Sequence, residues 1–187
     1  MWWREYRAAF RATRLAVVLG AASLLAGCFQ PLYGSHPSVG GDSIKDKLDE
    51  VQIAPIPLRQ GTPQARLAVG MRNALQFDLN GGAGPAAPTH RLDVTVSTTG
   101  FTVIVDVASG RPTAQVAGIA AHYQLVEIAT GKIVVSDTTF ANVDYDMPGS
   151  EQRFGAQRAL LDAEDHAVQS AAEAIRNRLA SYFVAGT

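Results

Sequence analysis

The side chain with the clearest capacity for chemistry is Cys28, the only cysteine in the 187-residue chain. It follows Leu25, Ala26 and Gly27, and Leu25 ends an eleven-residue apolar run that begins at Leu15. A single cysteine cannot form an internal disulfide, so the fold must be held by packing alone. Cys28 is therefore a candidate for covalent modification and not for cross-linking.

The segment before Cys28 has the three parts of an export signal. Arg4, Arg7, Arg11 and Arg14 form a basic start, the apolar run follows, and small residues precede the cleavage point. The run is too short for a membrane-spanning helix, which needs roughly 20 apolar residues. Leu25-Ala26-Gly27-Cys28 resembles a bacterial lipobox, which implies cleavage before Cys28 and a covalent lipid (diacylglycerol and an N-acyl chain) on this residue. The alternative is an ordinary secretory signal that ends at a chance cysteine.

The predicted lipid sets the strength and the place of anchoring. Each buried methylene contributes about 0.8 kcal/mol, and one acyl chain alone binds only marginally. Lipoproteins of this type usually carry three chains, which makes the anchor effectively permanent. Phe29 stands where an aspartate is the usual signal for retention at the inner membrane. We therefore expect the lipid-anchored protein to lie on the periplasmic side of the outer membrane.

Other reactive side chains do not converge in the sequence. The four histidines, His36, His90, His122 and His166, are widely separated. Asp162 and His166 are four residues apart on a predicted helix, and a surface ion pair is the expected meaning of that spacing. No third ligand follows by spacing, and no glycine-rich phosphate loop is present. We expect neither catalytic residues, nor a metal, nor any cofactor besides the lipid.

The charge balance excludes another class of function. The predicted signal, residues 1–27, holds four of the 16 basic and one of the 17 acidic residues. The mature chain keeps 12 basic against 16 acidic residues, and no basic stretch remains that could neutralise a run of phosphates. Nucleic acid is therefore excluded as a partner.

The mature chain divides into a tether, residues 28–47, and a domain, residues 48–187. The tether is rich in Gly, Pro and Ser. A short strand is predicted over Leu48–Ala54, and Pro55 and Pro57 end it. A helix is predicted from Thr62 as N-cap and Pro63 as first residue to Asn80-Gly81. Its apolar face is marked by Leu67, Met71, Ala74, Leu75 and Leu79, and Gly70 beside it suits close approach to a neighbour.

Three strands are predicted next. The first, from His90 to Thr98, alternates apolar with polar residues, and apolar residues resume after a bulge at Gly100. The second runs from Thr113 to Ile128 and the third from Lys132 to Tyr145, joined by a tight turn at Thr130-Gly131. These strands predict a long antiparallel meander with one polar face, which carries Thr95 and Ser97.

The last predicted helix covers Glu151 to Phe183. A stripe at close to 3.6-residue spacing comprises Leu161, Val168, Ala172, Ile175, Leu179 and Phe183. The element order is thus β-α-β-β-β-α. It predicts an α+β, two-layer sandwich with two helices packed on one face of a four-stranded sheet. The other face must meet water or a partner.

Three blocks together resemble the LptE family of LPS-assembly lipoproteins in its alphaproteobacterial form. They are Cys28-Phe29-Gln30-Pro31-Leu32-Tyr33-Gly34, then Arg66 to Leu75, and finally Ala172 to Phe183 around Ile175-Arg176-Asn177-Arg178-Leu179. The glycine that often separates the lipidated cysteine from the phenylalanine is absent.

The resemblance implies an outer-membrane lipoprotein that plugs the lumen of the LptD β-barrel, helps to assemble it and assists insertion of lipopolysaccharide (LPS). A wide barrel has a polar interior, and a plug with polar outer surfaces suits it. The alternative is a periplasm-facing lipoprotein that binds a small ligand or an envelope polymer on its sheet. Arg111 and Lys132, basic residues at the two turns of the meander, are candidates for contact with LPS phosphates. Solvated turn residues are the alternative explanation for both.

Overall fold

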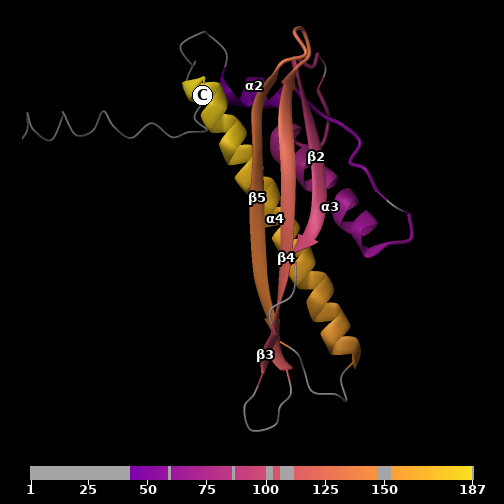
Figure 1. Cartoon of the computed structure of the whole chain (residues 1–187). Coiled ribbons are helices and arrows are strands. Elements are labelled where there is room, and N and C mark those ends of the chain that lie inside the picture. Colours follow the sequence, from indigo (N-terminus) through magenta and orange to yellow (C-terminus); the bar gives the residue numbers. More distant parts are fainter. Residues whose placement is uncertain are drawn as a thin grey trace, which may run out of the picture. The chain divides into compact units, whose positions relative to one another are not determined.

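The computed structural model describes residues 43–186, apart from residues 59, 86, 100–102, 106–111 and 147–152. These residues belong to one compact unit, Pro37–Thr187. Figure 1 shows the two long helices on the same side of the sheet. The predicted α+β class, with helices packed on one face of the sheet, is confirmed; the described residues form five strands because one of the four predicted strands is divided in two. The element order begins with one additional helix.

This additional helix, α2, covers Ile44–Asp49 and corrects the predicted tether and first strand. Ser43 caps it through a reciprocal capping box, in which its hydroxyl accepts from the Asp46 N–H and the Asp46 carboxylate accepts from the Ser43 N–H. Leu48 of α2 is buried in the core. Strand β1 is therefore shorter than predicted and covers only Val51–Ile53.

Helix α3 covers Pro63–Asn80, as its sequence signals predict. Thr62 has the extended backbone of an N-cap, and Pro63 occupies the first helical position. Gly81 ends the helix with φ of 60°, a left-handed conformation that glycine adopts without steric cost. The predicted apolar face is confirmed, since its long side chains are all buried: Leu67, Met71, Leu75 and Leu79.

Strand β4 (Pro112–Glu127) is the centre of the sheet. Strand β5 (Ile133–Asp146) pairs antiparallel with one of its edges. Strand β2 (His90–Thr99) pairs antiparallel with the other edge of β4. The short β3 (Val103–Val105) also pairs antiparallel with this edge, next to the end of β2. The predicted meander is thus confirmed, but its first strand is divided. Gly100, the predicted bulge, lies outside the described residues.

Strand β1 adds a parallel neighbour to this antiparallel meander. It pairs with the first residues of β2 in the register Val51 to His90. Parallel strands cannot be joined by a tight turn, so α3 provides the crossover between them. The sheet is therefore mixed.

Helix α4 covers Arg153–Ala185 without interruption. At 1.5 Å per residue, its 33 residues span roughly 50 Å. Many of its buried residues are alanines, which let the helix lie close to the sheet: Ala163, Ala167, Ala171, Ala172 and Ala180. Two predicted members of its stripe are not in the core, because Leu161 is exposed and Phe183 is only partly buried.

Helices α3 and α4 run parallel to each other. Arg66 near the start of α3 contacts Glu164, and Gly70 one turn later lies against Val168. A Cβ added to Gly70 would lie 3.7 Å from Val168 Cγ1, an ordinary contact distance. Close approach of the two helices therefore does not require a glycine here, contrary to the sequence-based interpretation.

Replacement of Gly70 by alanine is accordingly expected to stabilise the domain by about 0.5–1 kcal/mol, because alanine loses less backbone entropy in a helix. Urea unfolding of the variant measures this free energy. Gly81→Ala is the matched control, and it is expected to destabilise because Gly81 has a positive φ. A loss of stability in Gly70→Ala would contradict the prediction.

Arg66 joins the two helices through charge. Its guanidinium bonds the carboxylates of Glu164 and Asp165 on α4. The Glu164 side chain is only 9% exposed, so water solvates its carboxylate poorly and the contact with Arg66 takes the place of that solvation. A second ion pair, Arg91 with Asp93, lies on β2 with both side chains at least 40% exposed.

Replacement of Arg66 by methionine is expected to cost about 1–3 kcal/mol of unfolding free energy, because Glu164 loses its charged partner in a nearly buried position. The same substitution at Arg91 is the control, and it is expected to cost clearly less because an ion pair exposed to solvent contributes little to stability. Chemical denaturation at neutral pH gives both values. Equal losses of unfolding free energy in the two variants would show that the burial of Glu164 does not raise the cost of removing its partner.

Candidate functional site

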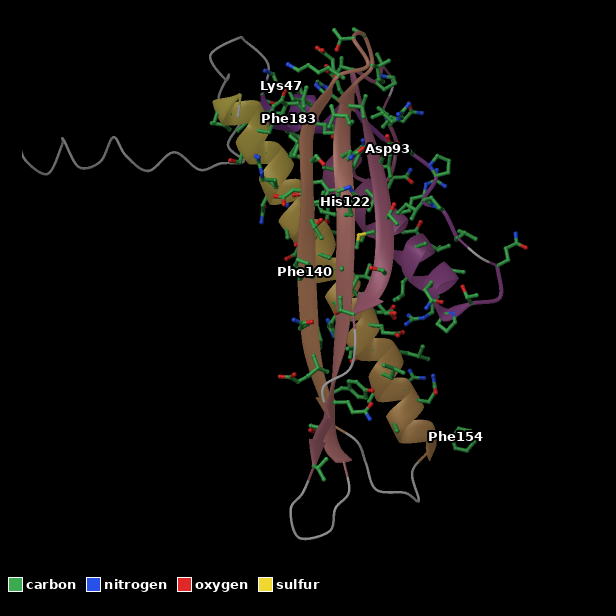
Figure 2. All side chains as sticks on the ribbon, viewed as in Figure 1. Lys47, Asp93, His122, Phe140, Phe154 and Phe183 are labelled. Carbon is green, nitrogen blue, oxygen red and sulfur yellow. The ribbon has the colours of Figure 1, made fainter. Side chains whose placement is uncertain are left out.

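The face of the sheet opposite α3 and α4 is polar, as the alternation in β2 predicts. Thr95 and Ser97 are both exposed there. The strand register places Thr95 beside His122 of β4 and His122 beside Thr138 of β5. The His122 Nδ1 and Thr138 Oγ1 atoms lie 3.1 Å apart. Figure 2 views the sheet from this side, with Asp93, His122 and Phe140 labelled.

A shallow hollow lies on this polar face. Its volume is about 390 Å³, which is within the range of small-ligand sites. The chain that follows β1 forms one wall and strands β2 and β4 form its floor. The lining residues are Ala54, Pro55, Pro57, Asp93, Val94, Thr95, His122 and Gln124.

An aromatic side chain interrupts the polar face. Phe140 of β5 is 67% exposed and lies opposite Ala120 in the register. Phe140 is a single exposed ring on an edge strand, which is common on protein surfaces, so it does not by itself mark a contact surface.

A second hollow, the end pocket, has a volume of about 460 Å³. It is formed by the end of α2, the first residue of β2 with the residue before it, the end of β4 and the last turns of α4. The residues that line it are Lys47, Glu50, Thr89, His90, Glu127, Tyr182, Phe183 and Gly186. The sequence-based search missed it, because its residues come from four distant segments and form no motif.

His90 is the central titratable group of the end pocket. Burial lowers its pKa, and the carboxylates of Glu127 and Glu50 oppose that shift more weakly. Burial therefore favours the neutral imidazole over the charged one. Its ring lies edge-on to the Phe183 ring, with 5.2 Å between the centroids.

Of the residues predicted from the sequence to carry function, Lys132 is the one that the structure describes. It is exposed and follows the turn between β4 and β5, where its N–H donates to Thr130 Oγ1 at 3.3 Å. Gly131 has φ of 69° in this turn, so the predicted Thr130-Gly131 turn is confirmed. Cys28 and Arg111 lie outside the described residues.

The Asp162 and His166 pair lies on the surface of α4. His166 Nε2 is 3.7 Å from Asp162 Oδ2, and the two side chains are 76% (Asp162) and 62% (His166) exposed. The prediction of a surface ion pair is thus confirmed in its geometry. In the described part of the chain, no three His, Cys, Asp or Glu side chains are grouped to hold a metal. Among the same residues, no helix combines the length and apolar character that a membrane span needs.

No family model and no curated protein sequence matches the chain. Its fold is nevertheless shared with solved structures. A candidate lipoprotein from Caulobacter crescentus CB15 matches with a TM-score of 0.56 at 19% identity, over 77% of this chain and 97% of the other. The rare lipoprotein B of Shewanella oneidensis matches with a TM-score of 0.50 at 13% identity, over 72% of this chain and 95% of the other. By fold, the chain resembles bacterial lipoproteins that include rare lipoprotein B.

Proposed function

We propose that the protein is an LPS-assembly lipoprotein of the outer membrane. In this proposal Cys28 carries the lipid that holds the chain at the periplasmic leaflet. The domain plugs the lumen of an LptD barrel, supports assembly of that barrel and assists delivery of LPS to the outer leaflet. The protein acts as a scaffold and catalyses no reaction.

The observation that carries the proposal is the shared fold with rare lipoprotein B, together with the lipobox at Cys28. The likeness spans 95% of that lipoprotein, so it covers a complete domain and not one common motif. The fold alone is compatible with other roles. The sequence blocks at residues 28–34, 66–75 and 172–183 are what favour the LptE family among them.

The surface of the domain is compatible with a place inside a barrel. The helices bury one face of the sheet, and the other face exposes hydroxyl, amide and imidazole groups along three strands. The lumen of a wide barrel is polar, and such groups can form hydrogen bonds with it directly or through water.

Co-purification tests the proposed partner. The chain, tagged at its C-terminus, is extracted with mild detergent from outer membranes and isolated under conditions that keep barrels folded. Stoichiometric recovery of a barrel protein of LptD type is expected. Recovery of the lipidated chain alone would contradict the plug role. It would favour the alternative of ligand binding on the sheet, for which the hollow beside Asp93 and His122 is the candidate site.

The proposed LPS contacts of Arg111 and Lys132 require a separate test. Pro112 begins β4 and Lys132 lies beyond its other end, so about 50 Å of strand separate Lys132 from the start of β4. We therefore expect the two residues to act independently. Arg111→Glu and Lys132→Glu are compared singly in LPS binding, with the exposed Arg158→Glu as control. Undiminished binding in both variants would refute the assignment.

A further inference from the structure

The end pocket combines both signs of charge with aromatic walls. Lys47 at the end of α2 brings a positive charge, and Glu50 and Glu127 bring two negative ones. Tyr182 and Phe183 of α4 supply the aromatic walls. Lys47 and Phe183 are labelled at the same end of the domain in Figure 2. A pocket of this composition suits a ligand that itself carries a cation and an anion.

The hydrogen bonds within the pocket determine where a cation would bind. The Thr89 hydroxyl lies 2.9 Å from Glu50 Oε2, and a carboxylate can only accept, so Thr89 donates to it. The same hydroxyl lies 2.9 Å from His90 Nδ1. The Thr89 hydroxyl has one proton, which it donates to Glu50. In the second bond it must therefore accept, and His90 Nδ1 carries the proton that is donated. The neutral imidazole then presents Nε2 as an acceptor, which adds to the acceptors of the two carboxylates.

The pocket lies at the end of the domain where the chain enters from Cys28. Ser43 begins the described structure as the cap of α2, and Lys47 and Glu50 follow within two turns. The fifteen residues from Cys28 to Asp42 span at most about 50 Å when fully extended. A lipid on Cys28 therefore keeps this end of the domain within reach of the head groups of the leaflet that holds the anchor.

We propose that the end pocket binds the phosphoethanolamine head group of a phospholipid in that leaflet. The ammonium group donates to Glu50, Glu127 and His90 Nε2, while the phosphate pairs with Lys47. The Tyr182 and Phe183 rings lie against the glycerol region, as aromatic side chains do at a membrane surface. The inference rests on the proposed lipid anchor, and it gives the domain a defined orientation at the membrane.

The proposed chemistry discriminates between head groups. The quaternary nitrogen of phosphatidylcholine has no N–H to donate, and its three methyl groups keep it away from the carboxylates. Phosphatidylglycerol has no cation and would be repelled by Glu50 and Glu127. Phosphatidylethanolamine alone of these three offers both a cationic N–H donor and the anion.

The test uses the lipidated chain in nanodiscs of phosphatidylcholine alone, or with phosphatidylethanolamine or phosphatidylglycerol added. Hydrogen exchange is followed in the peptides that contain Lys47 to Glu50 and Tyr182 to Gly186. With phosphatidylethanolamine we expect exchange to slow by about tenfold, the factor for a lipid present near tenfold above its dissociation constant. Glu50→Gln with Glu127→Gln is expected to abolish the slowing, whereas Asp162→Asn on the distant half of α4 should retain it.

Each other outcome overturns the inference. Equal exchange in all three lipids would show that the pocket is not occupied, and this comparison needs no variant. Slowing by phosphatidylglycerol as well would indicate general attraction of Lys47 to anionic surfaces. Slowing that persists in the double glutamine variant would place the contact elsewhere. Intact mass spectrometry before exchange separates these results from a failure of the anchor, since an unmodified chain would contradict the proposed function first.

Discussion

Replacement of Cys28 by alanine is expected to abolish acylation of the chain and with it the chain's own anchor in the membrane. Alanine has no sulfur to which diacylglycerol can be attached, and cleavage of the predicted signal depends on that modification. The product should be an uncleaved or a soluble chain without acyl groups. Three chains contribute about 0.8 kcal/mol per buried methylene, so without them the chain can be retained at the membrane only through a partner such as the proposed barrel. Acyl labelling and intact mass spectrometry measure the modification.

The neighbouring substitution Phe29→Ala is the matched control for Cys28→Ala. It changes the same segment but leaves the sulfur in place, so acylation and membrane fractionation should be unaffected. A Cys28→Ala chain that still sediments with outer membranes and is processed at the same site would contradict the lipobox. In that case the segment before Cys28 would be an ordinary secretory signal.

Local sequence signals were sufficient for most elements of the fold. Helix α3 has a proline at its first position and a left-handed glycine after its last, and both ends lie where these residues predict. The turn at Gly131 and the alternation in β2 fix the hairpin and its polar face in the same way. Each of these signals acts within a few residues, which is why a single sequence reveals them.

Helix α2 was missed although a signal for it was present. Ser43 and Asp46 have the spacing of a capping box, and the structure forms both of its hydrogen bonds. The segment is six residues long, too short to show an apolar period, and it follows a stretch rich in glycine and proline. Composition therefore favoured a tether. In the structure, the segment forms a helix that buries Leu48 against the core.

The end pocket could not have been found from the sequence. His90 was one of four scattered histidines, and nothing near it in the chain indicates Glu50, Glu127 or Phe183 as neighbours. The parallel pairing of β1 with β2 and the passage of α4 across the sheet bring these residues together. Such a site depends on tertiary topology, which local signals do not determine.

The exposed Leu161 shows the same limit within a helix. By spacing it shares the face of Val168, and that face of α4 meets α3 at Gly70. About one turn before Val168, however, α3 is already near its own first turn, where Arg66 meets Glu164, and Leu161 lies about one turn further back. The position that α3 would cover at Leu161 is therefore open. Leu179, on the same predicted stripe, belongs to the main core cluster and is completely buried.

Replacement of Leu179 by alanine is accordingly expected to cost about 2–5 kcal/mol, because it leaves a cavity in the layer between α4 and the sheet. Leu161→Ala removes the same atoms from the same helix, and it should cost less than about 1 kcal/mol because its side chain is 38% exposed. Urea denaturation of both variants, followed by circular dichroism, gives the difference. Similar losses would mean that the helix is held along its whole length, by its alanine contacts with the sheet as much as by α3. A loss confined to Leu179 would show that the stability of α4 resides in its C-terminal half, the half that also forms the wall of the end pocket.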